Sequence, residues 1–134
     1  MANEAAIIEL LGNKGDPIRY TVADATAIPK GSLLELDADR RVIVATSGTA
    51  PFVGIAAFEK VANDGTTTIS AYTNGIFNCV SDSGTDVRGT MMSTSAADNV
   101  IETGVAGDLL TRACVGYYLE AGTNAGTEAV RILI

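Results

Sequence analysis

Two carboxylates, Asp37 and Asp39, are close enough in this sequence to suggest general acid and base catalysis, which needs such a pair. They lie in the polar stretch at residues 37–40, between two apolar runs. Aspartate is favoured in turns because it hydrogen-bonds nearby backbone groups, and we therefore interpret both as turn residues. A hydrolase using Asp or Glu stays a third hypothesis, for the case in which two carboxylates meet in a cleft.

Other residues that could do chemistry lack the partners that their chemistry needs. Asp82, Ser83 and Asp86 suggest an oxygen-rich cation loop, but the calcium-loop spacing is not met, which favours a solvated loop. The sequence has no histidine, so the serines and threonines have no such base to activate them. We predict that the chain is not an enzyme and that it needs no metal or cofactor.

The two cysteines, Cys79 and Cys114, have no CxxC spacing and no companion ligands, which argues against a zinc site. We expect two small buried side chains in a reducing compartment, with no disulfide between them. Tyr117 and Tyr118 could stack a base or a sugar. Adjacent residues of a strand point to opposite faces, so we expect one in the core and one on the surface.

The net charge of −7 and the pI near 4.4 argue against nucleic-acid binding, which needs clustered Lys and Arg. Only Arg40 and Arg41 put two basic residues side by side, and no phosphate-binding glycine motif is present. Met1 is followed by Ala-Asn-Glu, unlike a signal peptide, and no apolar run is long enough for a transmembrane helix. We expect a chain made in the cytosol that binds neither nucleic acid nor membrane.

Strand-forming and turn-forming residues alternate at short intervals from Pro17 onward, which predicts an all-β fold, a single compact β-barrel or sandwich, over residues 17–134. Residues 33–45 predict one hairpin, and residues 53–72 predict another around Asn63-Asp64-Gly65. Residues 96–102 predict a helical turn or a loop. Residues 109–121 and 127–134 predict the last two strands.

Residues 69–80, ISAYTNGIFNCV, contain Asn74-Gly75, a strong hairpin signal. A hairpin would mix polar and apolar side chains on both faces. One continuous strand instead gathers apolar or small residues on its odd positions. We therefore predict a strand that bends at Gly75.

Part of the sequence repeats, since FVGIAAFEKVANDGTTTISAY aligns with CVGYYLEAGTNAGTEAVRILI, placing Val53-Gly54 on Val115-Gly116. Upstream, KGSLLEL aligns with AGDLLTR. An internal duplication and two independently similar barrel edges both explain this match. Gly54 and Gly116 both fall inside strands, where glycine marks a bulge, a bend or a close backbone approach.

The N-terminal residues 1–16 differ in character from the rest and predict an arm, extended or with a short helical turn. Their apolar residues are followed by the flexible stretch Gly12-Asn13-Lys14-Gly15. The arm either packs on its own barrel or docks on a neighbour. The side chains expected to make that contact are Ile7, Ile8, Leu10 and Leu11.

The order of glycines and apolar pairs resembles the head decoration, or capsid cement, proteins of tailed bacteriophages over residues 15–134. The residues that carry this resemblance are Thr21-Val22, Thr26, Ile28, Gly31, Leu33-Leu34, Val53-Gly54-Ile55-Ala56, Gly65, Ile69, Gly75-Ile76-Phe77, Gly107-Asp108 and Val115-Gly116. They are structural rather than catalytic. The glycines with an expected structural role are Gly31, Gly54, Gly75, Gly107 and Gly116.

The resemblance implies a β-barrel or β-tulip-like domain on the outer surface of the assembled virion head. Such proteins bind the major capsid protein, commonly as homotrimers, and stabilise contacts between its subunits. In several of them an N-terminal arm makes the contact with the shell. The alternative is another virion β-module, from a tail, a baseplate or a host-binding part.

Overall fold

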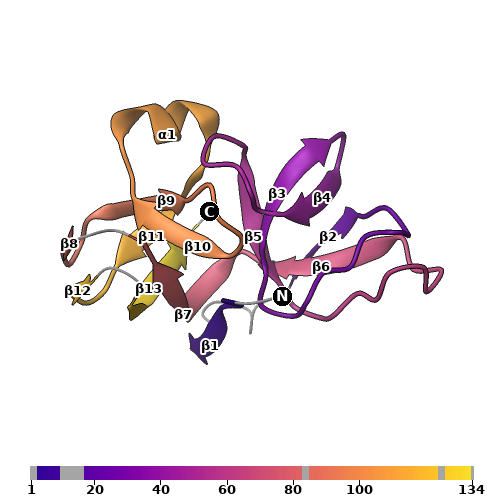
Figure 1. Ribbon diagram of the computed structural model, residues 1–134, viewed down its shortest axis with the longest axis horizontal. Helices are drawn as coiled ribbons and strands as arrows, with labels where there is room; N and C mark the ends of the chain where they lie inside the picture. Colours follow the sequence, from indigo (N-terminus) through magenta and orange to yellow (C-terminus); the bar gives the residue numbers. More distant parts are fainter. Residues whose placement is uncertain (1–2, 10–16, 83–84, 124–125, 134) are drawn as a thin grey trace.

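The computed structural model describes residues 3–9, 17–82, 85–123 and 126–133, and their regular secondary structure is almost entirely β-strand. One six-residue helix interrupts the strands (Figure 1). The predicted all-β barrel class is confirmed. Strand pairing closes two barrels along the chain, where the sequence predicted one.

The first barrel is a closed ring of five strands in the order β2-β4-β3-β5-β6. Its pairings are antiparallel except for β2 with β4, which are parallel. The two predicted hairpins are confirmed as β3–β4 and β5–β6. The bounds are β2 (Ile18–Thr21), β3 (Leu33–Ala38), β4 (Arg41–Val44), β5 (Phe52–Ala56) and β6 (Thr68–Tyr72).

The second barrel follows in the order β7-β10-β9-β11-β13, and it closes because β13 also pairs with β7. Again one pairing is parallel, that of β7 with β10. The N-terminal strand β1 adds to β7, and the short strands β8 and β12 pair outside the ring. The bounds are β1 (Ala6–Glu9), β7 (Asn74–Ser81), β8 (Thr85–Asp86), β9 (Met91–Thr94), β10 (Val100–Thr103), β11 (Cys114–Tyr118), β12 (Gly122–Thr123) and β13 (Thr127–Leu133).

The two barrels have the same strand order and the same strand directions. In each, the first strand pairs in parallel with the third and antiparallel with the fifth, and the fourth lies between the second and the fifth. Two independent edges would not be expected to agree over whole barrels, so this match favours an internal duplication. The sequence match of β5 with β11 and of β6 with β13 falls on equivalent strands.

The upstream part of the predicted repeat is wrong. KGSLLEL leads into β3, whereas AGDLLT forms the helix α1 (Ala106–Thr111). The structural equivalent of β3 is β9 instead. The helix fills the connection from β10 to β11, where the first barrel has the loop at residues 45–51.

The segment at residues 69–80 does not turn back on itself. Strands β6 and β7 are separated only by Thr73, and the chain passes there from one barrel into the other (Figure 1). Ile69, Ala71, Gly75 and Phe77 are all buried, with polar or half-buried residues between them. The absence of a hairpin and the apolar odd positions are confirmed. The single continuous strand is not, because β6 and β7 belong to different barrels and the break falls at Thr73. The β7–β13 register runs through Gly75 without a shift.

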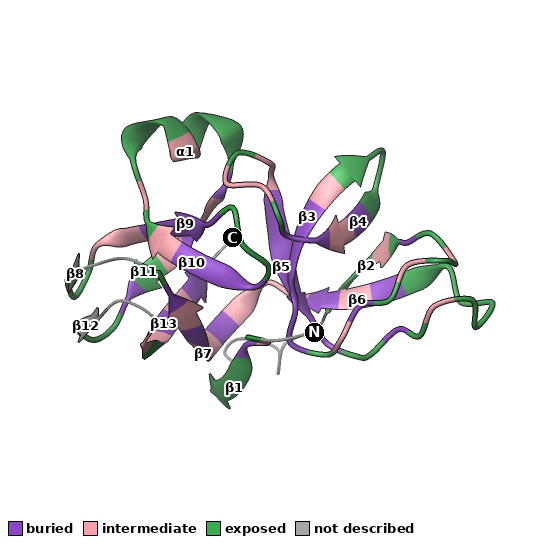
Figure 2. Ribbon diagram, in the orientation of Figure 1, coloured by how far each residue is buried: buried purple, intermediate pink, exposed green. Residues whose placement is uncertain are grey.

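The barrels share an apolar interface, because β5 is buried along its whole length (Figure 2). Val53 belongs to the core of the first barrel, while Phe52 and Ile55 pack into the core of the second. A strand covered on both faces needs an unbroken apolar run, which FVGIA supplies. Two hydrogen bonds add to the interface, from Phe52 N–H to the Arg112 carbonyl at 2.9 Å and from Leu33 N–H to Asn99 Oδ1 at 2.9 Å.

Two further predictions need correction. The stretch at 96–102 is a turn that runs into strand β10, and the strand predicted over 109–121 begins only at Cys114. The preceding residues are helical because the Asp108 carboxylate accepts a hydrogen bond from Val105 N–H at 2.6 Å, satisfying a free donor at the start of α1. Leucine also has a high helix propensity, which suits Leu109 and Leu110 to this turn.

Candidate functional site

Asp37 and Asp39 do not form a catalytic pair. Arg41 donates to both oxygens of Asp37, with Nη2 at 2.7 Å from Oδ2 and Nε at 3.0 Å from Oδ1. This hydrogen bonding lowers the pKa of the Asp37 carboxyl below its usual value. Asp37 is therefore held as an anion by its own hairpin. The turn is shorter than predicted, because Asp37 lies in β3 and only Asp39 and Arg40 form the turn.

The loop that contains Asp82, Ser83 and Asp86, for which the sequence favours a solvated loop over a cation site, is only partly described, since Ser83 lies outside the described residues. Asp82 Oδ2 accepts a hydrogen bond from Ser95 Oγ at 2.6 Å, which ties the start of the loop to the turn before β10. Within the described ranges, no three Asp, Glu or Cys residues come together as metal ligands.

The thiols and tyrosines behave as buried or surface groups. Cys79 is buried and Cys114 is half-buried, and both are free. Burial, and secondarily the nearby Glu128, raises the pKa of Cys79 to about 12. Tyr118 is fully buried and Tyr117 is exposed, so the prediction of one core and one surface tyrosine is confirmed.

Lys60 is a buried cation that the sequence did not single out. Its ammonium group donates to the carbonyls of Asp24 (2.9 Å) and Val61 (3.0 Å) and to Asp64 Oδ1 (3.2 Å). The Lys60 backbone also pairs with Ile28. An isolated lysine in a turn-rich stretch gives no sequence signal of burial, and this one joins two loops of the first barrel.

Three of the expected structural glycines lie where a Cβ atom would meet backbone. A Cβ on Gly54 would approach the Tyr72 carbonyl oxygen at 2.5 Å, and one on Gly116 the Arg131 carbonyl oxygen at 1.9 Å. A Cβ on Gly31 would approach the Ala5 carbonyl oxygen at the same distance as the Cβ on Gly54 approaches Tyr72, 2.5 Å. Gly107 differs, because it lies in α1 and a Cβ there would meet nothing within 4 Å.

The N-terminal residues lie partly on the second barrel. β1 pairs antiparallel with β7, and Ala5 just before it is buried in the core of the second barrel. Ile7 and Ile8 are 39% and 50% exposed. Leu10 and Leu11 lie outside the described residues.

A second exposed apolar surface is the α1 knuckle, which we define as Val105, Leu109 and Leu110. Helix α1 contributes no buried residue, and Leu110 is 88% exposed. The helix stands away from both barrels in Figures 1 and 2. A six-residue helix is not stable alone in water, so its apolar side chains gain from being covered.

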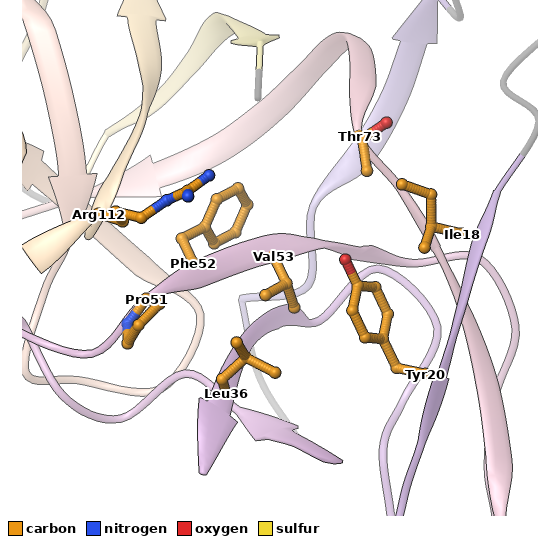
Figure 3. A pocket seen from close by; sticks show the side chains of 8 residues that line it. All are labelled: Ile18, Tyr20, Leu36, Pro51, Phe52, Val53, Thr73 and Arg112. Carbon is orange, nitrogen blue, oxygen red and sulfur yellow. The ribbon is translucent and has the colours of Figure 1, made fainter. Parts of the chain in front are cut away.

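A cavity of about 420 Å³ opens at one end of the first barrel (Figure 3). That end is formed by the start of β2 and β5 and the end of β3 and β6. The lining residues are Ile18, Tyr20, Leu36, Pro51, Phe52, Val53, Thr73 and Arg112. We call this cavity the mouth of the first barrel; its walls are apolar, with the cationic Arg112 next to Phe52.

In the described part of the chain, no helix is long and apolar enough to cross a membrane. Neither a protein-family model nor a curated protein sequence matches this chain. Its fold is similar to the crystal structure of the N base of the head fiber protein gp8.5 of bacteriophage phi29. The two are 14% identical, with a TM-score of 0.56, and the match covers 87% of this chain and 93% of that chain. The two-barrel chain thus has the fold of a protein from a phage head.

Proposed function

We propose that this chain is a structural protein of a phage head, which decorates the outer surface of the shell and stabilises contacts between major capsid subunits. The observation that carries the proposal is the likeness to a head-fiber base, which extends over nearly the whole chain rather than one barrel. The resemblance of the glycine pattern to decoration proteins supports the same role. We also propose that the chain binds as a homotrimer and that it has no catalytic activity.

The charge and the surface are consistent with an outer position. A chain of net charge −7 is repelled by DNA phosphates and is better placed outside the shell than within it. A protein that binds the assembled shell stabilises that shell by mass action. Because many copies of the protein bind, each copy needs only modest affinity.

The α1 knuckle is the surface that we assign to the shell contact. Its three apolar side chains are exposed on a helix for which the first barrel has no equivalent. Ile7 and Ile8, which the sequence predicts as shell-binding, are the second surface to test.

The test is binding of purified protein to expanded empty shells of the source virus, measured by co-sedimentation. We expect Leu110→Asp to weaken binding at least tenfold while leaving the unfolding temperature unchanged. Val61→Asp is the matched control, because Val61 is also an exposed apolar side chain, at 57%, on a different loop. Wild-type protein that fails to bind shells would contradict the decoration proposal, and equal loss in both variants would contradict the assignment to α1.

Ile8→Asp in the same assay tests the N-terminal strand. Loss of binding by this variant alone, with its self-association unchanged, would move the shell contact from α1 to β1. The alternative virion role, on a tail, a baseplate or a host-binding part, would be indicated by antibody labelling of purified particles away from the head.

A further inference from the structure

The internal duplication allows one barrel to serve as a reference for the other. The first strands, β2 and β7, each have two edges, of which one pairs with the last strand of the same barrel. On its other edge, β7 pairs with β10 only at Val80 and Ser81. The earlier part of that edge is covered by β1, which pairs with Ile76, Phe77 and Asn78.

The corresponding edge of β2 is open among the described residues. β2 pairs with β4 only at Thr21, whose N–H donates to the Arg40 carbonyl at 2.9 Å. Backbone groups two residues apart point to the same edge, so the N–H and C=O of Arg19 face the open side. Arg19 is exposed, and among the residues that the structure describes its one strand partner is Ser70 of β6.

The open edge of β2 is apolar on one face. Ile18 is 49% exposed, and together with Tyr20 it lines the mouth of the first barrel (Figure 3). An uncovered strand edge beside apolar side chains is a template for pairing with another strand, and proteins usually protect such edges. The mouth has room for a side chain of an added strand.

The chain itself has a second open edge of matching length. β1 pairs only with β7 among the described residues, so its outer edge is unpaired, and both β1 and β2 have four residues. Ile7 and Ile8 of β1 are exposed. In sequence, the β1 stretch AIIE has one acidic residue and no basic one. The pocket at the β2 edge is lined by two basic residues, Arg19 and Arg40, and one acidic residue, Asp39.

We propose that the outer edge of β1 in one copy pairs with the open edge of β2 in a second copy of this chain. The contact joins two different surfaces, so each copy gives one strand edge and receives another. Such a contact closes into a ring when the rotation between copies allows it. The pairing leaves β1 on its own β7, and it does not depend on binding to a viral head.

The test is sedimentation velocity of the full chain, without shells, up to about 1 mM, the order of effective concentration reached between tethered neighbours. Arg19→Pro removes an N–H from the open edge of β2, and Pro is tolerated there because that N–H faces away from β6. The double variant Ile7→Asp/Ile8→Asp disables the outer edge of β1. We expect wild type to associate, and each variant alone to bind at least tenfold more weakly.

Mixing the two variants is the decisive experiment, because each keeps the surface that the other has lost. We expect the mixture to form a 1:1 complex that grows no further. Ile18→Asp, which keeps the backbone N–H, should reproduce the defect of Arg19→Pro, and Val61→Asp should associate like wild type. A monomeric wild type, or a mixture that stays monomeric while both variants are folded, would overturn the proposal. Association that survives in the Ile7→Asp/Ile8→Asp variant would show that β2 pairs with itself instead.

Discussion

Gly54 and Gly116 occupy the same position in two successive barrels. Each follows a bulged valine in the fourth strand, since Leu34 pairs with Gly54 while Glu35 pairs with Phe52, and the β9–β11 register shifts in the same way before Gly116. The φ angles are +146° and +155°, and in both the glycine lies under a carbonyl oxygen of the fifth strand. The sequence predicted a bulge, a bend or a close backbone approach at these two glycines, and the structure has the bulge and the close approach.

We predict that Gly54→Ala and Gly116→Ala each destabilise the fold. The positive φ alone costs about 1–3 kcal/mol, and the Cβ must also displace a backbone oxygen. Gly116→Ala should be the worse of the two because its contact is closer, 1.9 Å against 2.5 Å. Chemical denaturation measures the loss of unfolding free energy.

Gly107→Ala is the matched control for these variants. Gly107 lies in α1 with open space around it, so alanine should stabilise by about 0.5–1 kcal/mol through its higher helix propensity. If Gly107→Ala lost as much stability as Gly116→Ala, the collision of a Cβ with backbone would not explain why the barrel positions need glycine.

Lys60→Ala should destabilise the first barrel by about 1–3 kcal/mol, because two carbonyls and the Asp64 carboxylate lose their shared donor. Lys60→Met, which keeps the length of the side chain, should cost less than alanine but still more than the exposed control Lys30→Ala. Thermal unfolding of the three variants at one pH checks the order. Equal stability of Lys60→Ala and Lys30→Ala would show that the buried ammonium contributes no net stability.

Strand identity, the hairpins and the apolar odd positions of residues 69–79 were predictable because each depends on local alternation and turn residues. The number of barrels was not, since closure depends on which strands pair across the chain, such as β7 with β13. Helix α1 was not predicted because Leu109 and Leu110 fit a buried strand as well as they fit a helix. In the structure both side chains are exposed. Asn99 and Lys60 were missed for a related reason, because a polar residue gives no local signal of burial.

The apolar N-terminal residues were recognised from sequence, but their placement on β7 was not. Deleting residues 2–14 is predicted to leave a folded domain with weaker shell binding. The deletion removes the buried Ala5 and uncovers the edge of β7, so the folding of the truncated protein must be measured together with its shell binding. Loss of soluble folded protein on deletion would show that the N-terminal residues belong to the core of the second barrel, and the point variants Ile7→Asp and Ile8→Asp keep that core intact.

Both thiols should be unreactive in the folded protein. Thiolate is the reactive form, and burial raises the pKa of both Cys79 and Cys114. A thiol reagent at pH 8 should label Cys114 slowly, since it is half-buried, and Cys79 only on unfolding. Under denaturing, non-reducing conditions both should react, and a count below two would reveal a disulfide.

Glu35 should make the protein less stable as the pH rises above the ordinary carboxyl pKa of 4.5. Burial is the main cause that raises its pKa above the ordinary value of 4.5, against the hydrogen bond that it accepts from Ser47 N–H at 3.2 Å. The folded state therefore holds a proton that the unfolded state has already released. Stability is lost as the pH rises from the unfolded pKa through the higher folded pKa.

Glu35→Gln should remove this part of the pH dependence and raise the unfolding free energy at pH 7 relative to wild type. The amide oxygen can still accept the bond from Ser47, so the Ser47 loop is expected to keep its position. Unfolding free energies measured from pH 4 to pH 8 give the slope for both proteins. Asp39→Asn is the control, because Asp39 is an exposed carboxylate in the neighbouring turn. A wild-type curve parallel to that of Glu35→Gln would contradict the assignment of the slope to Glu35.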